Sequence, residues 1–466
     1  MTTTTTNTPD SKPDSKRASP ERDANDGSPK KSKYFLGEDV PTALTERTQV
    51  PENRKLWEAT MGFCQHWEAD NDALGVRNVM AVFYLLAKCV AAGNTGTTGT
   101  TDRPAFLDYF PANEAWFQYV GRFLALYCRD VTHGGSPIRL TATTNATAEA
   151  IGGVKIETLK MADGFDAMAT LINADCNAAT KGKIPEIVQG SDLNNPKLQL
   201  VAMAAEFIKG TLCAPYKGDT KANWPFQGTE GNDKGTCHLM RQKESSRDAL
   251  TFRGTTFEAA VLSTKTSDGQ PSTIKLVAVL PDEDEVTKST RQTSKEAMGK
   301  AAAEFAAGKT IDTLVSLVAT PHNQALPDTQ KKVEMPRIER KMAPFDITDM
   351  CGKELPVALL DGLDHITEVA NKDGEWKMDP MKVSKVVHAT YLKVDETGFE
   401  AAAATAVIAF RSLGADFDEP EPILRFDRGF LFFILDMNED TPHVLYHARV
   451  ESDVGLKEAP AAPWKA

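Results

Sequence analysis

The pattern of hydrophobic and polar positions predicts helices in the first part of the chain. The run NVMAVFYLLAKCVAA (78–92) is apolar on nearly every side, which is typical of a buried helix. AWFQYVGRFLALYCRDV (115–131) is amphipathic and rich in aromatic residues, and we expect the segment from about 48 to 130 to be helical. FDAMATLINADCNAATKGKI (165–184) predicts another helix, which ends at a Lys-Gly pair.

After about residue 199 the pattern becomes typical of strands. We expect strands at LQLVAMAAEF (198–207), KLVAVLP (275–281), KVSKVVHATYLKV (382–394) and GFLFFILD (429–436). The last run is apolar and aromatic, which suits a sheet that is buried on both faces. A further helix is predicted at 294–308, between the groups of strands. Because no Pro/Ser-rich linker follows residue 36, these elements predict one α+β domain.

The first 33 residues are mainly Thr, Ser, Pro, Asp and Lys. Such a segment cannot bury enough apolar surface to offset its ordering entropy. We therefore predict a disordered polar tail at 1–33 and a folded domain at 34–466. The KKSK cluster at 30–33 is interpreted as solvated charge, with a nuclear address as the alternative.

Composition narrows the classes of partner. The formal net charge of −12 argues against nucleic acid, which favours a basic surface. No apolar run reaches the roughly 18 residues of a membrane span, so no membrane partner is expected. The N-terminus has no apolar core typical of a secretory signal, and the seven cysteines form no CxxC. These features predict reduced thiols in a cytoplasmic protein.

The sequence lacks the common catalytic and cofactor-binding motifs. GxSxG, GxxxxGK[ST], GxGxxG and HExxH are absent. Cys237 and His238 are adjacent, but neighbours on a strand point to opposite faces and cannot easily share a proton. His443 and His447 lie in a predicted strand with no third metal ligand near them. We therefore expect a protein that is not an enzyme and that has no metal and no cofactor.

The segment VDETGFEAAAATAVIAFRSL (394–413) combines helix-forming alanines with strand-like flanks. Gly398 interrupts the preceding strand pattern, and two prolines beyond the segment indicate a loop. In a strand, one face would carry Phe399, Ala401, Ala403 and Thr405, and the other would carry Glu400, Ala402 and Ala404. Apart from Phe399, the first set is small enough to enter between existing strands. The segment therefore suits a chain that is a loop in one state and a central strand in another.

This segment resembles the hinge of the serpins, a family of suicide protease inhibitors, whose pattern is Glu-x-Gly-Thr-Glu-Ala-Ala-Ala-x-Thr. The strand before it, at 382–394, is similar to the family's LxVSxVxHKAxIEV. Further stretches that resemble family motifs are INADCNAATKGKI (172–184), AAEFIKGTL (204–212), CHLMRQ (237–242), RFDRGFLFFILD (425–436) and VLYHARV (444–450). Their order along the chain matches the family order, which is more specific than any one stretch.

The resemblance implies an α+β serpin fold with three β-sheets, about nine helices and an exposed reactive-centre loop at about 396–424. It also implies that a target protease attacks this loop and forms an acyl-enzyme. The cut loop then inserts as a new strand in the central sheet, so that deacylation stalls. The implied hinge residues are Glu396, Gly398, Phe399, Glu400, Ala401, Ala402, Ala403, Ala404 and Thr405.

Family spacing, counted from the hinge glycine, places the reactive bond near Ser412. We prefer the bond between Arg411 and Ser412, because a long cation suits the acidic specificity pocket of a trypsin-like serine protease. Phe410 and Leu413 are the alternatives, and Phe410 would suit chymotrypsin-like or cathepsin-type pockets. The implied partner is thus a target protease, and the implied state is a monomer with loop–sheet polymers as a hazard.

Several residues depart from the family pattern. Phe399 stands where the family has a small polar residue, and it would face inward and overpack the sheet unless an enlarged neighbouring site accepts its ring. Ala204 replaces an asparagine that normally bonds the histidine of the shutter, here His388, and Asp175 and Leu212 replace tryptophans. These departures favour an alternative to inhibition: a serpin-fold protein with a chaperone, storage or binding role. Inhibition of a trypsin-like serine protease remains the preferred function, with a cysteine protease as the alternative target.

Overall fold

The computed structural model describes most of the region between residues 57 and 456. The described residues are 57–58, 60–62, 64, 73–94, 107, 122–132, 134–195, 198–206, 208–229, 234–241, 249–266, 268–283, 293–319, 331–341, 345–346, 366–378, 387–399, 423–438, 441–453 and 456. All of them lie within the compact unit Ser32–Ala466.

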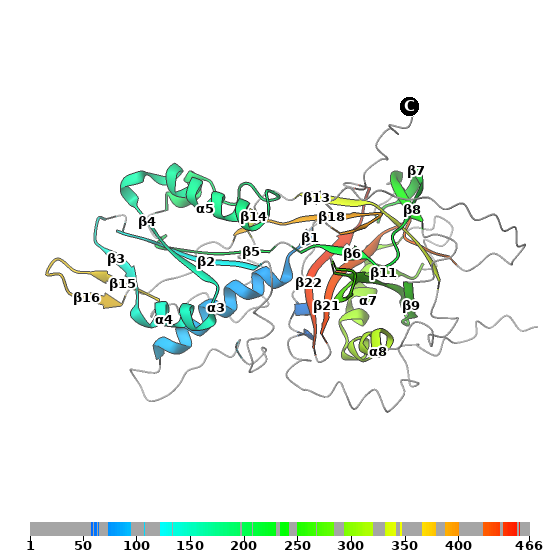
Figure 1. Ribbon diagram of the computed structural model, residues 1–466, viewed down its shortest axis with the longest axis horizontal. Helices are drawn as coiled ribbons and strands as arrows, with labels where there is room; N and C mark the ends of the chain where they lie inside the picture. The colour runs from blue at the N-terminus through cyan, green and yellow to red at the C-terminus, as the bar shows by residue number, and fades with distance from the viewer. Residues whose placement is uncertain are drawn as a thin grey trace, which may run out of the picture. The chain divides into compact units, whose positions relative to one another are not determined.

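A ten-stranded sheet organises the C-terminal half of the chain, in the order β1-β22-β21-β11-β10-β6-β19-β18-β13, with β9 paired to β10. Its strands are β1 (Ala73–Leu74), β6 (Gly210–Leu212), β9 (Ala249–Arg253), β10 (Phe257–Lys265), β11 (Pro271–Pro281), β13 (Ile338–Lys341), β18 (Tyr391–Asp395), β19 (Gly398–Phe399), β21 (Phe430–Asn438) and β22 (Thr441–Val450). Figure 1 shows β21 and β22, drawn in red, side by side and next to β11.

Four smaller sheets complete the β-structure of the described residues. The first contains β20 (Ile423–Arg425), β12 (Lys332–Pro336), β8 (Lys234–Arg241) and β7 (Lys217–Gln227). The second contains β4 (Val154–Leu159), β2 (Arg122–Arg129) and β5 (Leu200–Glu206). The third contains β16 (Trp376–Met378), β15 (Thr367–Ala370) and β3 (Ile138–Leu140), and the fourth pairs β14 (Phe345–Asp346) with β17 (Val387–His388).

Two of the described helices start with a hydroxyl side chain that caps the first turn. The described helices are α3 (Val76–Asn94), α4 (Ala142–Ile151), η3 (Met161–Asp163), α5 (Phe165–Ala179), α6 (Gly190–Leu193), α7 (Lys295–Ala306) and α8 (Gly308–Ala319). The side chain of Thr141 accepts a hydrogen bond from the backbone of Thr144 at the start of α4. Ser294 caps α7 in the same way through the amide of Ala297. Each cap satisfies a backbone N–H that has no partner inside its helix.

Three hydrophobic clusters fill the space between these layers. The first lies between one face of β10, β11 and β21 and the helices α3, α7 and α8. The opposite face of the same strands contributes to the second cluster, together with β8, β12 and β18. The third joins α5 to the sheet β4-β2-β5. Because β10, β11 and β21 are buried on both faces, their sequences are apolar runs rather than alternating ones.

The helix predicted at 115–131 is wrong for the part that the structure describes, since Arg122–Arg129 forms the strand β2. This strand lies in the middle of its sheet, and residues 124–129 are all buried. Leu124 and Leu126 pack into the first cluster, whereas Ala125 and Tyr127 pack into the third. A short apolar run buried on both sides cannot be distinguished from a buried helix by periodicity. Residues 115–121 lie outside the described residues.

Ala73–Leu74, within the segment 48–130 that was expected to be helical, instead forms the short strand β1, which pairs with β22. The other predicted elements are confirmed where they are described, and the helix expected at 78–92 is α3. The helix expected at 165–184 is α5, and it is followed by Lys181 and Gly182, both with positive φ. The helix expected at 294–308 is α7. The strands expected at 198–207, 275–281 and 429–436 correspond to β5, β11 and β21. The segment 382–394 contains the strands β17 and β18.

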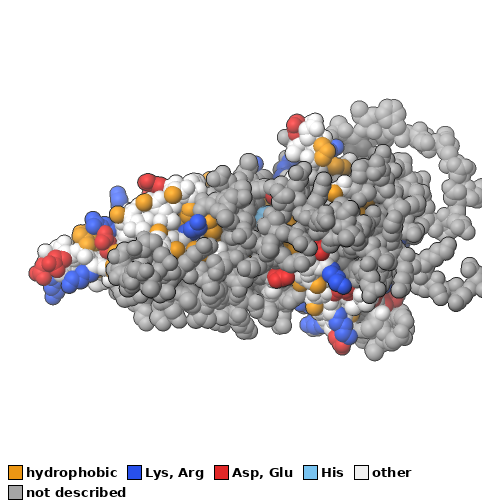
Figure 2. Space-filling model, turned by 90° about the horizontal axis from the view of Figure 1, so that it is seen from below, with side chains coloured by type: hydrophobic (Ala, Val, Ile, Leu, Met, Phe, Trp, Pro, Cys, Tyr) orange, Lys and Arg blue, Asp and Glu red, His pale blue; other side chains and the backbone are white. Residues whose placement is uncertain are grey.

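The described surface carries charges of both signs. On the face shown in Figure 2, Lys and Arg side chains are interspersed with Asp and Glu side chains. Among the described residues, none of the helices has both the length and the apolarity needed to cross a membrane.

His447 makes the core of the large sheet sensitive to acid. It is buried on β22, where its ring stacks on Phe433 at 4.7 Å between centroids. Burial, with a smaller contribution from Arg449, lowers the pKa of His447 to about 3. The unfolded chain takes up this proton near pH 6.5, so below that pH the unfolded state binds more protons than the folded state. Above pH 6.5 both states are neutral at this residue, and its contribution is constant.

We therefore expect His447 alone to remove about 1.4 kcal/mol of stability for each pH unit below about 6.5. Urea unfolding between pH 7 and pH 4 measures this slope. His447→Phe keeps a ring that can stack on Phe433 but has no proton to bind. Its stability should fall less steeply over the same range, and equal slopes for both proteins would contradict the assignment.

Candidate functional site

The predicted hinge begins inside the large sheet. The strand β18 ends at Asp395, the chain turns at Glu396 and Thr397, and β19 (Gly398–Phe399) runs back beside it. Phe399 pairs with Val394 on β18 and with Gly210 on β6. The amide of Leu212 also donates a hydrogen bond to the carbonyl of Thr397, at 2.8 Å. The two residues of β19 therefore have strand neighbours on both sides.

The ring of Phe399 fills a space that depends on Gly210. Phe399 is only 1% exposed, which confirms that its side chain faces inward. A Cβ atom added to Gly210 would lie 2.2 Å from Cζ of Phe399 and 2.4 Å from Cε1. The absence of a side chain at residue 210 thus provides the room for the ring. From the sequence, Phe399 would either overpack the sheet or lie in an enlarged neighbouring site. The structure shows the second case, because Gly210 leaves room for the ring.

Gly398 is restricted by the same neighbour. Its φ is 151°, and a Cβ atom at this position would lie 2.0 Å from the carbonyl oxygen of Gly210. Backbone cannot move aside as a flexible side chain can. The close approach of β19 to β6 therefore requires glycine at residue 398.

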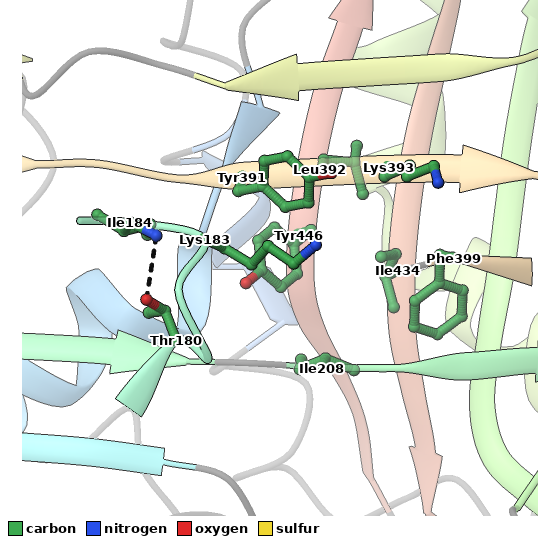
Figure 3. Close-up of a pocket in the computed structure, with 10 residues that line it drawn as sticks. All are labelled: Thr180, Lys183, Ile184, Ile208, Tyr391, Leu392, Lys393, Phe399, Ile434 and Tyr446. Carbon is green, nitrogen blue, oxygen red and sulfur yellow. Dashed lines mark hydrogen bonds between the residues drawn. The ribbon is translucent and has the colours of Figure 1, made fainter. Parts of the chain in front are cut away.

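A pocket lies next to Phe399, between β18 and the segment that joins β5 to β6 (Figure 3). Ile208 lines one side, Tyr391 and Lys393 line the other, and Ile434 and Tyr446 from β21 and β22 also contribute. In the described part of the chain, β18 pairs with β19 only through Val394 and Asp395, whereas Tyr391, Leu392 and Lys393 pair with β13 alone. The edge of β18 therefore borders this pocket, called the gap below, and an edge can accept a further strand.

An ion pair holds the turn before β19. Arg337 donates through Nε to both carboxylate oxygens of Glu396, at 2.8 and 2.9 Å, and through Nη2 to Oε1 at 2.5 Å. The Glu396 side chain is 15% exposed and that of Arg337 25%. Nε2 of the buried His238 lies 3.5 Å from the same carboxylate. Burial, reinforced by Arg337, lowers the pKa of His238 against the opposing effect of Glu396, so Arg337 is the main counter-charge at neutral pH.

The chain after residues 400–422, which lie outside the described residues, is anchored in the four-stranded sheet. β20 (Ile423–Arg425) runs parallel to β12, and Arg425 donates through Nε to the buried carboxylate of Glu334. Arg241 on β8 forms a second ion pair with Glu334. The ring of Trp224 lies 4.9 Å from the guanidinium of Arg425 and 5.9 Å from that of Arg241. Contacts of this kind add cation–π attraction to the two ion pairs.

Asp175 is one of the residues that depart from the family pattern. Its carboxylate accepts hydrogen bonds from the hydroxyl of Tyr127 and the ammonium group of Lys155. Both groups lie 2.6 Å from Oδ2 of Asp175. Burial is the main reason that the pKa of Tyr127 is raised, and the hydrogen bond to Asp175 adds to it. These contacts join α5 to β2 and β4. The aspartate therefore links the helix to the sheet through polar contacts.

The structure places only part of the predicted site. Glu396, Gly398 and Phe399 lie together at the start of β19, whereas Glu400, Ala401, Ala402, Ala403, Ala404, Thr405, Phe410, Arg411, Ser412 and Leu413 lie outside the described residues. His388 is on β17, where its backbone pairs with Phe345. Sequence reasoning missed Gly210 and Arg337. Gly210 belongs to the quoted motif AAEFIKGTL and could have been singled out, but Arg337 gave no signal.

Comparisons with known proteins agree with this fold. The family model Serpin (serine protease inhibitor) matches residues 142–450. The leukocyte elastase inhibitor of Bos taurus is 26% identical over 292 residues, which cover 62% of this chain and 67% of that protein. Alpha-1-antitrypsin 1-3 of Mus musculus is 44% identical over a shorter stretch of 63 residues, which cover 14% of this chain and 14% of that protein.

Solved structures show the same fold over most of the chain. Serpin48 of the insect Tenebrio molitor has a TM-score of 0.59 and 16% identity, covering 89% of this chain and 100% of that chain. Thyroxine-binding globulin in complex with thyroxine has a TM-score of 0.57 and 16% identity, covering 87% and 99%. The chain belongs to the serpin family, and the predicted α+β serpin fold is confirmed.

Proposed function

We propose that the chain inhibits a protease as a suicide substrate. The observation that carries this proposal is β19, because the hinge already pairs with β18 and β6 at the end of a bordered gap. The protease attacks the loop and becomes joined to it as an acyl-enzyme. The cut loop then continues from Phe399 along the gap as a new central strand. Movement of the attached protease distorts its oxyanion hole, and the acyl-enzyme is not hydrolysed.

The geometry of β19 supports this direction of insertion. Gly398 and Phe399 fix the register of the new strand against both neighbours, so Ala401, Ala403 and Thr405 would follow on the inward face. Alanine loses almost no side-chain entropy on burial, which favours such a step. Glu334 and Arg425 hold the far end of the loop at β20, so that cleavage, rather than loss of β20, releases the new strand.

We propose a trypsin-like serine protease as the target, with Arg411 and Ser412 flanking the reactive bond. The loop carries an arginine near the position that family spacing gives to the bait residue. A cysteine protease and the bonds next to Phe410 or Leu413 are the alternatives. Action inside the cell, as a monomer, remains a prediction from the sequence.

Incubation with trypsin at near-equal molar amounts tests the activity. On a denaturing gel we expect a band at the mass of trypsin plus residues 1–411, and a released fragment that begins at Ser412. Arg411→Ala should abolish the band, whereas the matched control Arg411→Lys should retain it, because lysine also suits a trypsin-like pocket. Clean cleavage at this bond with full trypsin activity remaining would contradict inhibition of this class of protease.

The second candidate is a serpin-fold protein that binds rather than inhibits. The observation that favours it is the tight burial of Phe399, which holds the hinge in one place. Thyroxine-binding globulin shows that a protein of this fold can carry a small ligand. On this alternative, no band at the summed mass forms with any protease that cuts the loop.

A further inference from the structure

In the described part of the chain, β16 is an edge strand that pairs only with β15, which pairs in turn with β3. The amide of Ala370 on β15 donates to the carbonyl of Pro137 on the β3 side. The amide of the next residue, Asn371, donates instead to the carbonyl of Glu375 on the β16 side. The N–H and C=O groups of successive residues point to alternate sides of a strand. Those of Trp376 therefore point away from β15, to the side where the structure describes no further strand.

Both faces of β16, together with Glu375 just before it, carry exposed side chains. Trp376 and Met378 share one face, and 37% and 53% of their surface is exposed. Glu375 and Lys377 share the other face and are also exposed. The guanidinium of Arg139 on β3 lies 3.9 Å from the centroid of the Trp376 ring and holds the ring in place. A large side chain that is already held loses little freedom when a partner covers it, and Trp is enriched in interfaces.

A second copy of this strand matches the edge in one register. A two-fold axis through Trp376 sets the two strands antiparallel, with residue 375 of each copy opposite residue 377 of the other. Glu375 then faces Lys377 twice, and these opposite charges attract each other across the strands. The same register brings the outward N–H and C=O groups of the two Trp376 residues together, so that they can form two hydrogen bonds.

Neighbouring registers lack this match. Residues that face each other across antiparallel strands lie on the same face of the joined sheet, so the axis must pass through a residue rather than between two. An axis through Lys377 would set two lysines opposite each other, and an axis through Glu375 would set two glutamates opposite each other. Like charges that are directly opposite destabilise a pair of strands. The axis through Trp376 is therefore favoured.

We propose that β16 is a dimer interface between two copies of this chain, in which their three-stranded sheets join into one sheet of six strands. The occupant is a second copy, because the charges beside and within β16 are complementary to themselves. Only three residues form the strand, so the interface is small and the association is weak. We therefore expect a monomer in dilute solution and a dimer at high concentration. The proposal does not depend on protease inhibition.

Sedimentation equilibrium of the full chain at low ionic strength measures this association. Between about 10 μM and 1 mM, we expect the weight-average mass to rise from the monomer value towards twice that value. A mass that stays at the monomer value over the whole range would overturn the proposal.

Reversing one charge of the strand tests the register. Glu375→Lys and Lys377→Glu each set like charges opposite each other, so each variant alone should dimerise about tenfold more weakly. An equimolar mixture of the two variants sets opposite charges at both positions again and should recover most of the loss. Lys372→Glu is the matched control, because it reverses an exposed charge outside the strand and should change dimerisation little. Undiminished dimerisation of Glu375→Lys, or no recovery in the mixture, would overturn the proposal.

Discussion

Replacing Gly210 with alanine is expected to push Phe399 out of the sheet. The new Cβ would lie 2.2 to 3.0 Å from three atoms of the ring, closer than carbon atoms approach one another. Forcing both groups into the same space costs about 1–3 kcal/mol in a packed core. Expelling the ring instead loses about 1.5–3 kcal/mol of apolar burial. By either route, Gly210→Ala should lower the free energy of unfolding by about 2 kcal/mol, measured by urea denaturation.

A double-mutant cycle separates this contact from other effects of the alanine. In a Phe399→Ala background the ring is absent, and Gly210→Ala should change stability by less than about 0.5 kcal/mol. Limited proteolysis after residue 399 should also be faster in Gly210→Ala than in the unmodified protein. If Gly210→Ala lowered the free energy of unfolding equally in both backgrounds, the contact between Gly210 and the ring of Phe399 would not explain the loss.

Replacing Arg337 with methionine is expected to weaken the turn before β19. The substitution keeps most of the side-chain volume but leaves the carboxylate of Glu396, which is 15% exposed, without its bidentate partner. Removing one partner of a largely buried ion pair costs about 3–5 kcal/mol, and the partial exposure of Arg337 reduces this to about 2–3 kcal/mol. Thermal and urea unfolding of Arg337→Met measure the loss.

A surface ion pair on α7 supplies the control. Lys300 and Glu296 lie 2.6 Å apart, and their side chains are 63% and 76% exposed. Exposed pairs contribute about 0–1 kcal/mol, so Lys300→Met should have a much smaller effect than Arg337→Met. Arg337→Met combined with Glu396→Gln should regain part of the loss, because the amide carries no charge that needs a partner. If the single lysine variant lost as much stability as Arg337→Met, the role given to Arg337 would be contradicted.

Much of the fold could be predicted from the sequence, because its long helices and strands follow regular hydrophobic patterns. The apolar run of β21 and the periodic helix α5 were both predicted within a few residues of their observed bounds. The strand β2 was not, since burial on both faces removes the alternation that identifies a strand. A run that is buried on both faces is therefore ambiguous: it was identified correctly as a strand at β21 and wrongly as a helix at β2.

Less of the candidate site than of the fold could be predicted from the sequence. Parity along the chain indicated that Phe399 faces inward, and the structure confirms it. Gly210 contacts Phe399, and Arg337 pairs with Glu396, but both partners lie far away in the sequence. The folded sheet brings each pair together, and the spacing of residues along the chain does not predict which strands pair. The roles of Gly210 and Arg337 are therefore evident only from the folded structure.

Thermal unfolding before and after cleavage of the loop tests the central claim most directly. A catalytic amount of a metalloprotease, which forms no acyl-enzyme and so is not trapped, gives the cleaved form when it is stopped after cutting between residues 405 and 413. If the cut loop continues from Phe399 as a new strand in the gap beside β18, its backbone gains partners on both sides and the unfolding temperature should rise markedly. Ala403→Arg would place a charge on the inward face, so the cleaved form of this variant should show no such rise. An unchanged or lower unfolding temperature after cleavage of the unmodified protein would contradict loop insertion.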